Sequence, residues 1–270
     1  MGTSQGLSQA GSEISCEATT GRSATAAACI RNALPLLWRR RVFCEQKMPE
    51  LTPDLIVIGF IWYIVFLFST TCHEASHALA AKLGGDDTAT LGGQLTLNPV
   101  PHIRREPWGM VLVPLLAFLF TRQIIGWASA PINPEWERRY PKRSAWMAFA
   151  GPAANFTLML IAVVLIHLAR HFGWFYRGPD GKAGFFELIV SAFYFLNLLL
   201  GVFNLLPVPP LDGSTGIMLF MGEGTARSYL DWLRTSPYRL VGLLIAFYGF
   251  RYIYGPIEDF ATRLLIFGRF

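Results

Sequence analysis

Charged residues are scarce in this sequence. Asp, Glu, Lys and Arg make up 15% of its 270 residues, whereas 53% are hydrophobic. Soluble globular domains carry charge at about a quarter of their positions. A soluble fold would have to hide several helices that are hydrophobic on every side, and a chain this short has no core large enough for them. The shortage of charge therefore favours a membrane protein.

Cysteine and histidine are also few. Four cysteines in 270 residues do not make a disulfide framework. Five histidines fall short of the histidine clusters that membrane di-iron oxygenases need. That enzyme class is therefore excluded.

No basic stripe accompanies the net charge of +5. The basic residues are instead distributed over separate polar segments, such as 39–41, 104–105 and 138–143. Charge that flanks apolar runs is what membrane proteins use to set their orientation. We therefore expect no nucleic-acid partner.

Five apolar runs dominate the rest of the chain. A helix that crosses a bilayer needs about 20 residues at a rise of 1.5 Å each. Candidate runs extend from Leu55 to about Lys82, Gly109 to about Gly126, Ser144 to Leu168, Phe185 to Leu206 and Tyr238 to Tyr254. They predict an all-α polytopic membrane protein with about five transmembrane helices, in contact with lipid and placed in the cell membrane.

The segment after the first run has a different pattern. Paired glycines at 84–85 and 92–93 bracket two short stretches, and residues 94–97 alternate polar and apolar side chains as a strand does. We expect a small β-hairpin or a re-entrant loop at the membrane surface here.

Residues 1–50 differ in character from the rest of the chain. They are rich in Ser, Ala, Thr and Gly without a sustained period, which predicts a disordered N-terminal extension. Met48 is an alternative start. Residues 51–270 are expected to form a single membrane-embedded domain, and they show no repetition in two halves as a transporter would.

The most informative motif is HEASH at residues 73–77, which matches HExxH. Positions i and i+4 of a helix lie on one face, so His73 and His77 can bind one metal while Glu74 acts on a water. These residue types are costly inside an apolar helix and by default mark a functional site there. Residues 69–71 add a polar half to the same helix. The alternative is a set of buried polar residues with a structural role.

A catalytic zinc takes three protein ligands and leaves one position open. Asp212 is the only acid between Glu187 and Glu223, and it is our candidate for the third ligand. Taken alone, Asp212 is more simply an ordinary loop carboxylate after a proline-rich helix end. Pairing with the HEASH motif favours the role of a ligand instead.

Three motifs in this order resemble the site-2 protease family of intramembrane metalloproteases. They are the HEASH motif, GPAAN at residues 151–155 and NLLPVPPLDG at residues 204–213. The similarity extends from about residue 55 to the end and is to the compact branch without an inserted PDZ domain. Ala75 and Ser76 stand where Leu-Gly is commoner, and Arg104 replaces an expected acid.

The resemblance implies a role for each matching residue. His73, His77 and Asp212 would hold one zinc ion per chain, and Glu74 would be the catalytic acid/base. Asn155 and Asn204 would hold the substrate backbone or stabilise the oxyanion. The implied function is zinc-dependent hydrolysis of peptide bonds in or near transmembrane segments of membrane-protein substrates.

A non-catalytic metal-binding membrane protein, either a transporter or a protease-like scaffold, is the alternative function. A scaffold would be expected to lose Glu74 first, yet that residue is present. For an enzyme, the alternating residues 94–97 suggest an edge on which an unwound substrate adds as a strand.

Overall fold

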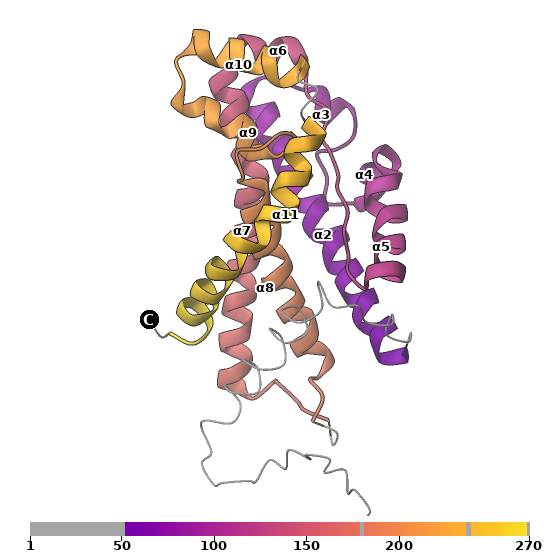
Figure 1. Ribbon diagram of the computed structural model, residues 1–270. Helices are drawn as coiled ribbons and strands as arrows, with labels where there is room; N and C mark the ends of the chain where they lie inside the picture. Colours follow the sequence, from indigo (N-terminus) through magenta and orange to yellow (C-terminus); the bar gives the residue numbers. More distant parts are fainter. Residues whose placement is uncertain (1–51, 179–180, 236–238, 269–270) are drawn as a thin grey trace, which may run out of the picture. The chain divides into compact units, whose positions relative to one another are not determined.

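Helices account for most of the computed structural model shown in Figure 1. The structure describes residues 52–178, 181–235 and 239–268, which belong to one compact unit, Glu50–Phe270. The expectations for residues 1–50, namely disorder and a possible start at Met48, lie outside the described residues.

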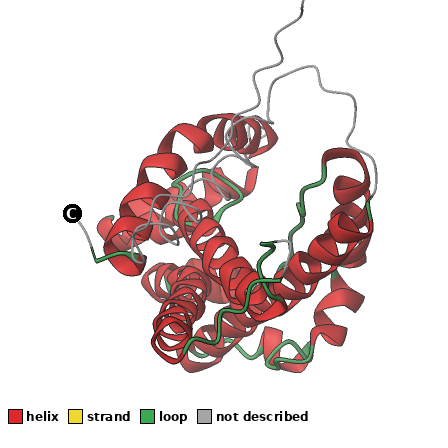
Figure 2. Ribbon diagram, turned by 90° about the horizontal axis from the view of Figure 1, so that it is seen from below, coloured by secondary structure: helices red, strands yellow, loops and turns green. Residues whose placement is uncertain are grey.

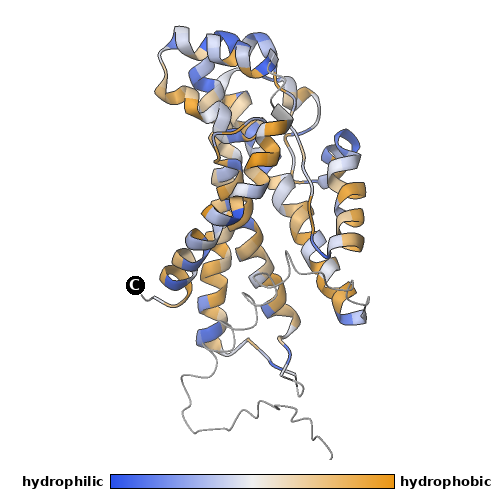
Figure 3. Cartoon of the chain, in the orientation of Figure 1, coloured by the Kyte–Doolittle hydropathy of each residue, from blue (hydrophilic) through white to orange (hydrophobic). Residues whose placement is uncertain are grey.

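Three helices are long and apolar enough to cross a membrane: α2 (Pro53–Gly84), α7 (Pro141–Phe172) and α8 (Phe185–Asn204). Only 39%, 39% and 44% of their most apolar windows are buried within the protein. More than half of each window is therefore not buried, and Figure 3 shows that hydrophobic residues predominate along all three helices. Such surface is suited to lipid rather than to water.

Local capping explains where these helices begin and end. The Thr52 hydroxyl caps α2 by accepting from the Leu55 N–H, and Pro53 occupies the first turn. Gly85 ends α2 in the left-handed conformation, at φ 97°. Gly173 ends α7 in the same way, at φ 70°.

Helix α7 packs against both α2 and α8. One apolar cluster joins α7 and α8 to the C-terminal helix and contains Val163, Tyr194 and Phe250. A second cluster joins α2 to α8 through Phe66 and Leu196. The three long helices therefore form the frame on which the remaining elements are placed.

The second predicted span is not a full-length helix. A π-helical turn, η1 (Trp108–Leu112), leads into α5 (Val113–Thr121), and at 1.5 Å per residue the pair extends only about 21 Å, short of the ~30 Å hydrocarbon core. Arg122 then adopts a left-handed conformation, φ 61°. The chain returns through an extended segment, residues 124–133, whose Trp127 N–H donates to Gly109 O over 3.1 Å.

The fifth predicted span corresponds to α11 (Arg239–Ala261), which continues into the π-helical turn η3 (Thr262–Ile266). Arg251 and three tyrosines lower the mean hydropathy of this helix. Within the described residues it is not among the three helices that qualify as spans. The predicted count of about five spans is thus not confirmed.

The predicted β-hairpin is also not confirmed, because residues 86–106 contain two short helices and no strand: α3 (Thr88–Leu91) and α4 (Pro99–Arg105). Local side-chain hydrogen bonds override the alternating pattern. Thr88 donates to the Asp86 carboxylate, and Asn98 accepts from the Val100 N–H. Such local bonds favour turns and helix starts over strands. Figure 2 shows helices and loops throughout the described residues.

The remaining short helices lie near the N-terminal end of α7. They are α6 (Pro134–Arg139), α9 (Asp212–Gly216), the 3-10 turn η2 (Ile217–Phe220) and α10 (Glu223–Thr235). Ala226 and Leu230 of α10 pack with Ala145 of α7 and Met218 of η2. This packing holds α9, which carries Asp212, against α7.

Candidate metal centre

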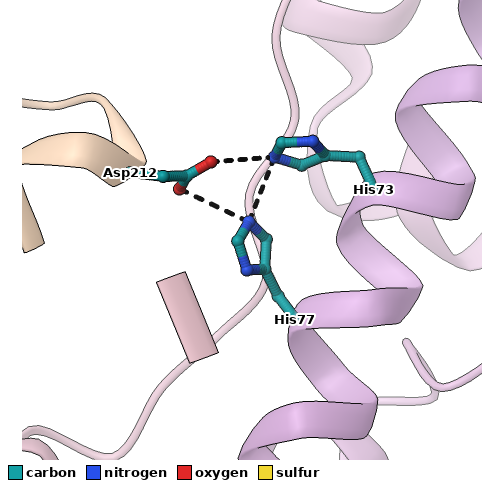
Figure 4. Close-up of side chains that lie close together, drawn as sticks. All are labelled: His73, His77 and Asp212. Atoms are coloured by element: carbon teal, nitrogen blue, oxygen red, sulfur yellow. Dashed lines mark hydrogen bonds and ion pairs between the residues drawn. The ribbon is translucent and has the colours of Figure 1, made fainter. Parts of the chain in front are cut away.

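Helix α2 brings His73 and His77 to one face, as the spacing predicts. Both side chains are buried, and their Nε2 atoms lie 3.0 Å apart (Figure 4). The two rings are nearly perpendicular, at 82°. Each ring thus turns one nitrogen toward the same point.

Asp212 approaches that point from the first turn of α9. Its Oδ2 lies 3.1 Å from His73 Nε2, and its Oδ1 lies 3.3 Å from His77 Nε2 (Figure 4). One ligand atom from each of the three residues lies within 4.8 Å of the others. The structure therefore brings together the three residues that we expected to hold a metal.

The opposite nitrogens of both rings are held by oxygen atoms. His77 Nδ1 lies 2.8 Å from the Met147 carbonyl oxygen, and His73 Nδ1 lies 2.6 Å from Asn155 Oδ1. A carbonyl oxygen only accepts, so His77 carries a proton on Nδ1, and in the neutral ring Nε2 is left free. Metal-binding histidines have this arrangement, in which the outer oxygen fixes the ring and its tautomer.

The donor set fits a zinc ion. Donors held tetrahedrally about 2.0–2.1 Å from zinc lie roughly 3.3–3.4 Å apart, close to the observed separations of 3.0–3.3 Å. In the neutral rings, two Nε2 lone pairs and a carboxylate at such distances repel one another unless a proton or a cation lies between them. Two histidines and one carboxylate are also an established ligand set of catalytic zinc.

Gly151 of α7 forms the floor of this site. A Cβ atom at Gly151 would lie only 2.4 Å from His77 Nε2 and 2.5 Å from His73 Nε2. Any side chain there would occupy the space toward which the nitrogens point. The glycine of the GPAAN motif is therefore required by the geometry of the site.

Close backbone packing fixes the position of Asp212. A Cβ at the next residue, Gly213, would meet Leu205 O at 2.2 Å, so the start of α9 lies directly against the end of α8. The Lys142 ammonium of α7 donates to the carbonyl oxygens of Met218, Leu219 and Met221. It thereby ties the turn that follows α9 to α7.

The other predicted site residues lie nearby but are bonded differently. Glu74 is buried and makes no hydrogen bond or ion pair with any described residue. Asn204, at the end of α8, donates to Leu200 O of its own helix over 3.0 Å. Asn155 is fully buried, and its amide nitrogen donates to Asn197 Oδ1 over 2.9 Å. The substrate-binding roles of the two asparagines stay predictions.

Gly151 and Asn197 were not assigned roles from the sequence. Gly151 lay within a motif that the resemblance had singled out, but a glycine carries no chemistry of its own. Asn197 had one usable signal, because an amide in the middle of a 20-residue apolar helix must find a partner there.

Comparison with known proteins points to the same metal. The chain is 36% identical over 155 residues to "Putative zinc metalloprotease YwhC" of Bacillus subtilis (strain 168), covering 56% of this chain and 64% of that protein. It is 29% identical over 163 residues to "Putative zinc metalloprotease Rip2" of Mycolicibacterium smegmatis, covering 60% and 58%. The Rip2 protein of Mycobacterium tuberculosis (strain H37Rv) is 27% identical over 182 residues, covering 67% and 64%.

The chain thus spans less than two thirds of the length of these relatives. No family model matches it, and no solved structure matches it. The relatives' names and the cluster of His73, His77 and Asp212 support a zinc metalloprotease family. The part of the chain that the structure describes also contains three helices long and apolar enough to span a bilayer.

Proposed function

We propose that the chain is an intramembrane zinc endopeptidase of the site-2 protease type, a multi-pass protein of the cell membrane. Its substrates are membrane proteins, cleaved in or near their transmembrane segments. The observation that carries the proposal is the convergence of His73, His77 and Asp212 on one point. Two of these residues belong to a helix that is long and apolar enough to span a bilayer.

The chain's own residues divide the chemistry between them. When bound, zinc supplies Lewis acidity that lowers the pKa of a water to about 7. Glu74 takes the proton of the attacking water and passes it to the leaving amine. Its carboxylate is buried beside the proposed ligands in sequence and is not itself one of them. Asn204 would bind the substrate backbone by donating to a substrate carbonyl in place of the Leu200 carbonyl.

The rival function is metal binding without catalysis, as in a transporter or a scaffold. Glu74→Gln separates the two, because glutamine keeps the size of the side chain but cannot accept the proton. We expect the purified variant to keep its zinc while cleavage of a transmembrane peptide in detergent falls by ~10²–10⁴-fold. A protein that only binds metal would keep its metal-dependent function.

Two sets of controls accompany this variant. His73→Ala, His77→Ala and Asp212→Ala each remove a ligand, so zinc content and cleavage should fall together. Glu187→Gln changes another buried acid of the same domain, one paired with Arg177 over 3.2 Å, and should leave both unchanged. Zinc is measured by mass spectrometry beside the cleavage assay. Cleavage by Glu74→Gln at the wild-type rate, with zinc bound, would refute the proposed mechanism.

A further inference from the structure

A chain of buried side-chain hydrogen bonds links the three long helices to one metal ligand. Asn197 of α8 donates from Nδ2 to Ser69 Oγ of α2 over 2.9 Å. Asn155 of α7 donates from Nδ2 to Asn197 Oδ1 over 2.9 Å. His73 of α2 completes the chain through the 2.6 Å contact between its Nδ1 and Asn155 Oδ1. Ser69, Asn155 and Asn197 are all fully buried.

The donor-to-acceptor direction of these linked hydrogen bonds is determined at Asn197. Besides Ser69, the Asn197 amide nitrogen donates to the Phe193 carbonyl oxygen of its own helix over 2.9 Å. A carbonyl oxygen only accepts, so the Asn197 NH₂ group faces it and Oδ1 faces Asn155. Asn155 must then present its own NH₂ to Asn197 and its Oδ1 to His73. The His73 Nδ1 has an acceptor opposite it and carries the proton.

The direction of these hydrogen bonds determines which nitrogen of His73 offers a lone pair to the metal site. A neutral histidine protonated at Nδ1 has its lone pair on Nε2, and His73 Nε2 is the atom directed at Asp212 and His77. Reversing either amide would place an NH₂ group opposite Nδ1 and favour the wrong tautomer. A backbone carbonyl of α8 thus selects the form of His73 that can bind a cation.

We propose that Asn197 is a positioning residue of the metal centre, which acts through Asn155 to hold the ring orientation and tautomer of His73. This inference rests on the proposed function, because it assigns the two asparagines to the same zinc site. It gives Asn155 a role behind the ligand in place of direct contact with substrate. His77 needs no such device, since its Nδ1 is held by a backbone oxygen.

The competing explanation is that the amides only hold the helices together, as polar residues often do between membrane helices. Tyr194 offers a matched control on the same helix. Its hydroxyl lies 3.2 Å from Thr262 Oγ1 of η3, and the side chain is also almost fully buried. Tyr194→Phe removes an interhelical bond of α8 that is not part of the chain to His73.

The test is the zinc affinity of the purified full chain in detergent, measured by competition with a chromogenic chelator. Removing an outer-shell partner of a metal-binding histidine lowers metal affinity by about 10–100-fold, and we expect Asn155→Ala and Asn197→Ala to do so. Tyr194→Phe should leave affinity unchanged even where it lowers the melting temperature. Equal affinity in wild type and Asn197→Ala, or an equal loss in Tyr194→Phe, would overturn the inference.

Two further variants test how the effect is transmitted. If Asn197 acts only through Asn155, the Asn155→Ala/Asn197→Ala double variant should bind zinc no more weakly than Asn155→Ala alone. Losses that multiply would contradict this. Asn155→Asp keeps an acceptor opposite His73 Nδ1 and should recover most of the affinity lost in Asn155→Ala. No recovery, in a variant that melts like wild type, would also count against the proposal.

Failure of the inference is distinct from failure of the proposed function. The affinity assay requires no cleavage, so an inactive protein that binds zinc still tests the role of Asn197. Absence of zinc binding by the wild-type chain would overturn the proposed function. Zinc binding by the wild type that is insensitive to Asn197 would overturn only this inference.

Discussion

At the scale of single residues, the two histidines of the metal centre are held by different means. Met147 O fixes His77 through the backbone, where no substitution can remove it. Asn155 fixes His73 through a side chain, so this ligand depends on residues that mutation can change. The support of His77 therefore cannot be removed by substitution, whereas that of His73 can. We expect substitutions behind the ligands to weaken metal binding mainly through His73.

The clearest test at this scale is Gly151→Ala. The added methyl group would lie 2.4–2.5 Å from both Nε2 atoms, in the space where the cation belongs. We expect purified protein of this variant to contain little or no zinc and to lack cleavage activity. Gly249→Ala on α11 is the matched control, because its Cβ would meet nothing within 4 Å. Normal zinc content in Gly151→Ala would show that the ion lies elsewhere.

The ligands themselves could be predicted from the sequence, because a helix fixes the relation of positions 73 and 77 without tertiary information. Asp212 could be proposed as the only acid in its stretch of sequence and from the resemblance, but its distance from the histidines could not be predicted, because only the fold brings α9 to them. Asn197 could not be placed, because its role depends on the register between α7 and α8. A sequence shows that a buried amide needs a partner but not which helix provides it.

At the scale of elements, Asp86 ties the loop after α2 to the loop before α6. Burial raises the pKa of Asp86, but hydrogen bonds from the Thr88 hydroxyl and the N–H groups of Asn133 and Thr88 outweigh it and hold the pKa below its ordinary value. A carboxyl group with a depressed pKa stabilises the fold above the unfolded-state pKa, near 3.9. That stabilisation is lost as the pH falls through the folded-state pKa.

Asp86→Asn should therefore destabilise the protein at pH 7 by roughly 1–3 kcal/mol, because an amide replaces a carboxylate that accepts several hydrogen bonds. The difference in melting temperature between variant and wild type should shrink as the pH falls from about 5 toward 3. Thermal melts in detergent across this range provide the measurement. A difference that is independent of pH would mean that the charge of Asp86 contributes nothing.

Lys142 makes a second prediction at this scale. Its ammonium group donates to carbonyl oxygens at the end of η2, just after the helix that carries Asp212. Lys142→Met keeps the aliphatic stem and removes the charged donor, at a cost of about 1.5–3 kcal/mol. We expect a lower melting temperature and weaker zinc binding, since α9 is held less firmly. Unchanged zinc affinity in a destabilised variant would show that α9 is positioned without this bond.

The errors in the predicted elements have a common physical origin. Residues 94–97 alternate like a strand, yet they lie between two short helices, whose first residues bond to the side chains of Asp86 and Asn98. The described residues offer them no partner strand. In the second run, apolar composition predicted a span, whereas Arg122 ends α5 early. Composition reports the environment of a segment, but caps and breaks decide its length.

At the scale of the whole molecule, the metal centre lies toward one end of the long helices. The rise of 1.5 Å per residue puts His73 about 30 Å from Pro53 but only about 16 Å from Gly84. Gly151 likewise lies about 15 Å from Pro141, the start of α7. Because α2 and α7 run in opposite directions (Figure 1), both estimates refer to the same end. Peptide and water would therefore reach the site from that side.

This arrangement predicts a definite topology. We expect η1 and α5 to enter the membrane and residues 124–133 to return to the same side. In that case only α2, α7 and α8 cross the membrane and determine on which side each loop lies. Leu91, which follows α2, and Ser228, on α10 after α8, then face one side of the membrane. Lys182, between α7 and α8, faces the other. All three side chains are exposed.

Single cysteines at these positions test the topology in a background from which Cys16, Cys29, Cys44 and Cys72 have been removed. A membrane-impermeant maleimide applied to intact cells should label either Lys182→Cys alone or both Leu91→Cys and Ser228→Cys. Lysed cells should label all three and provide the control for reactivity. Labelling of Leu91→Cys and Ser228→Cys from opposite sides would mean that an uneven number of crossings separates them, so that α5 or another segment spans the membrane as well.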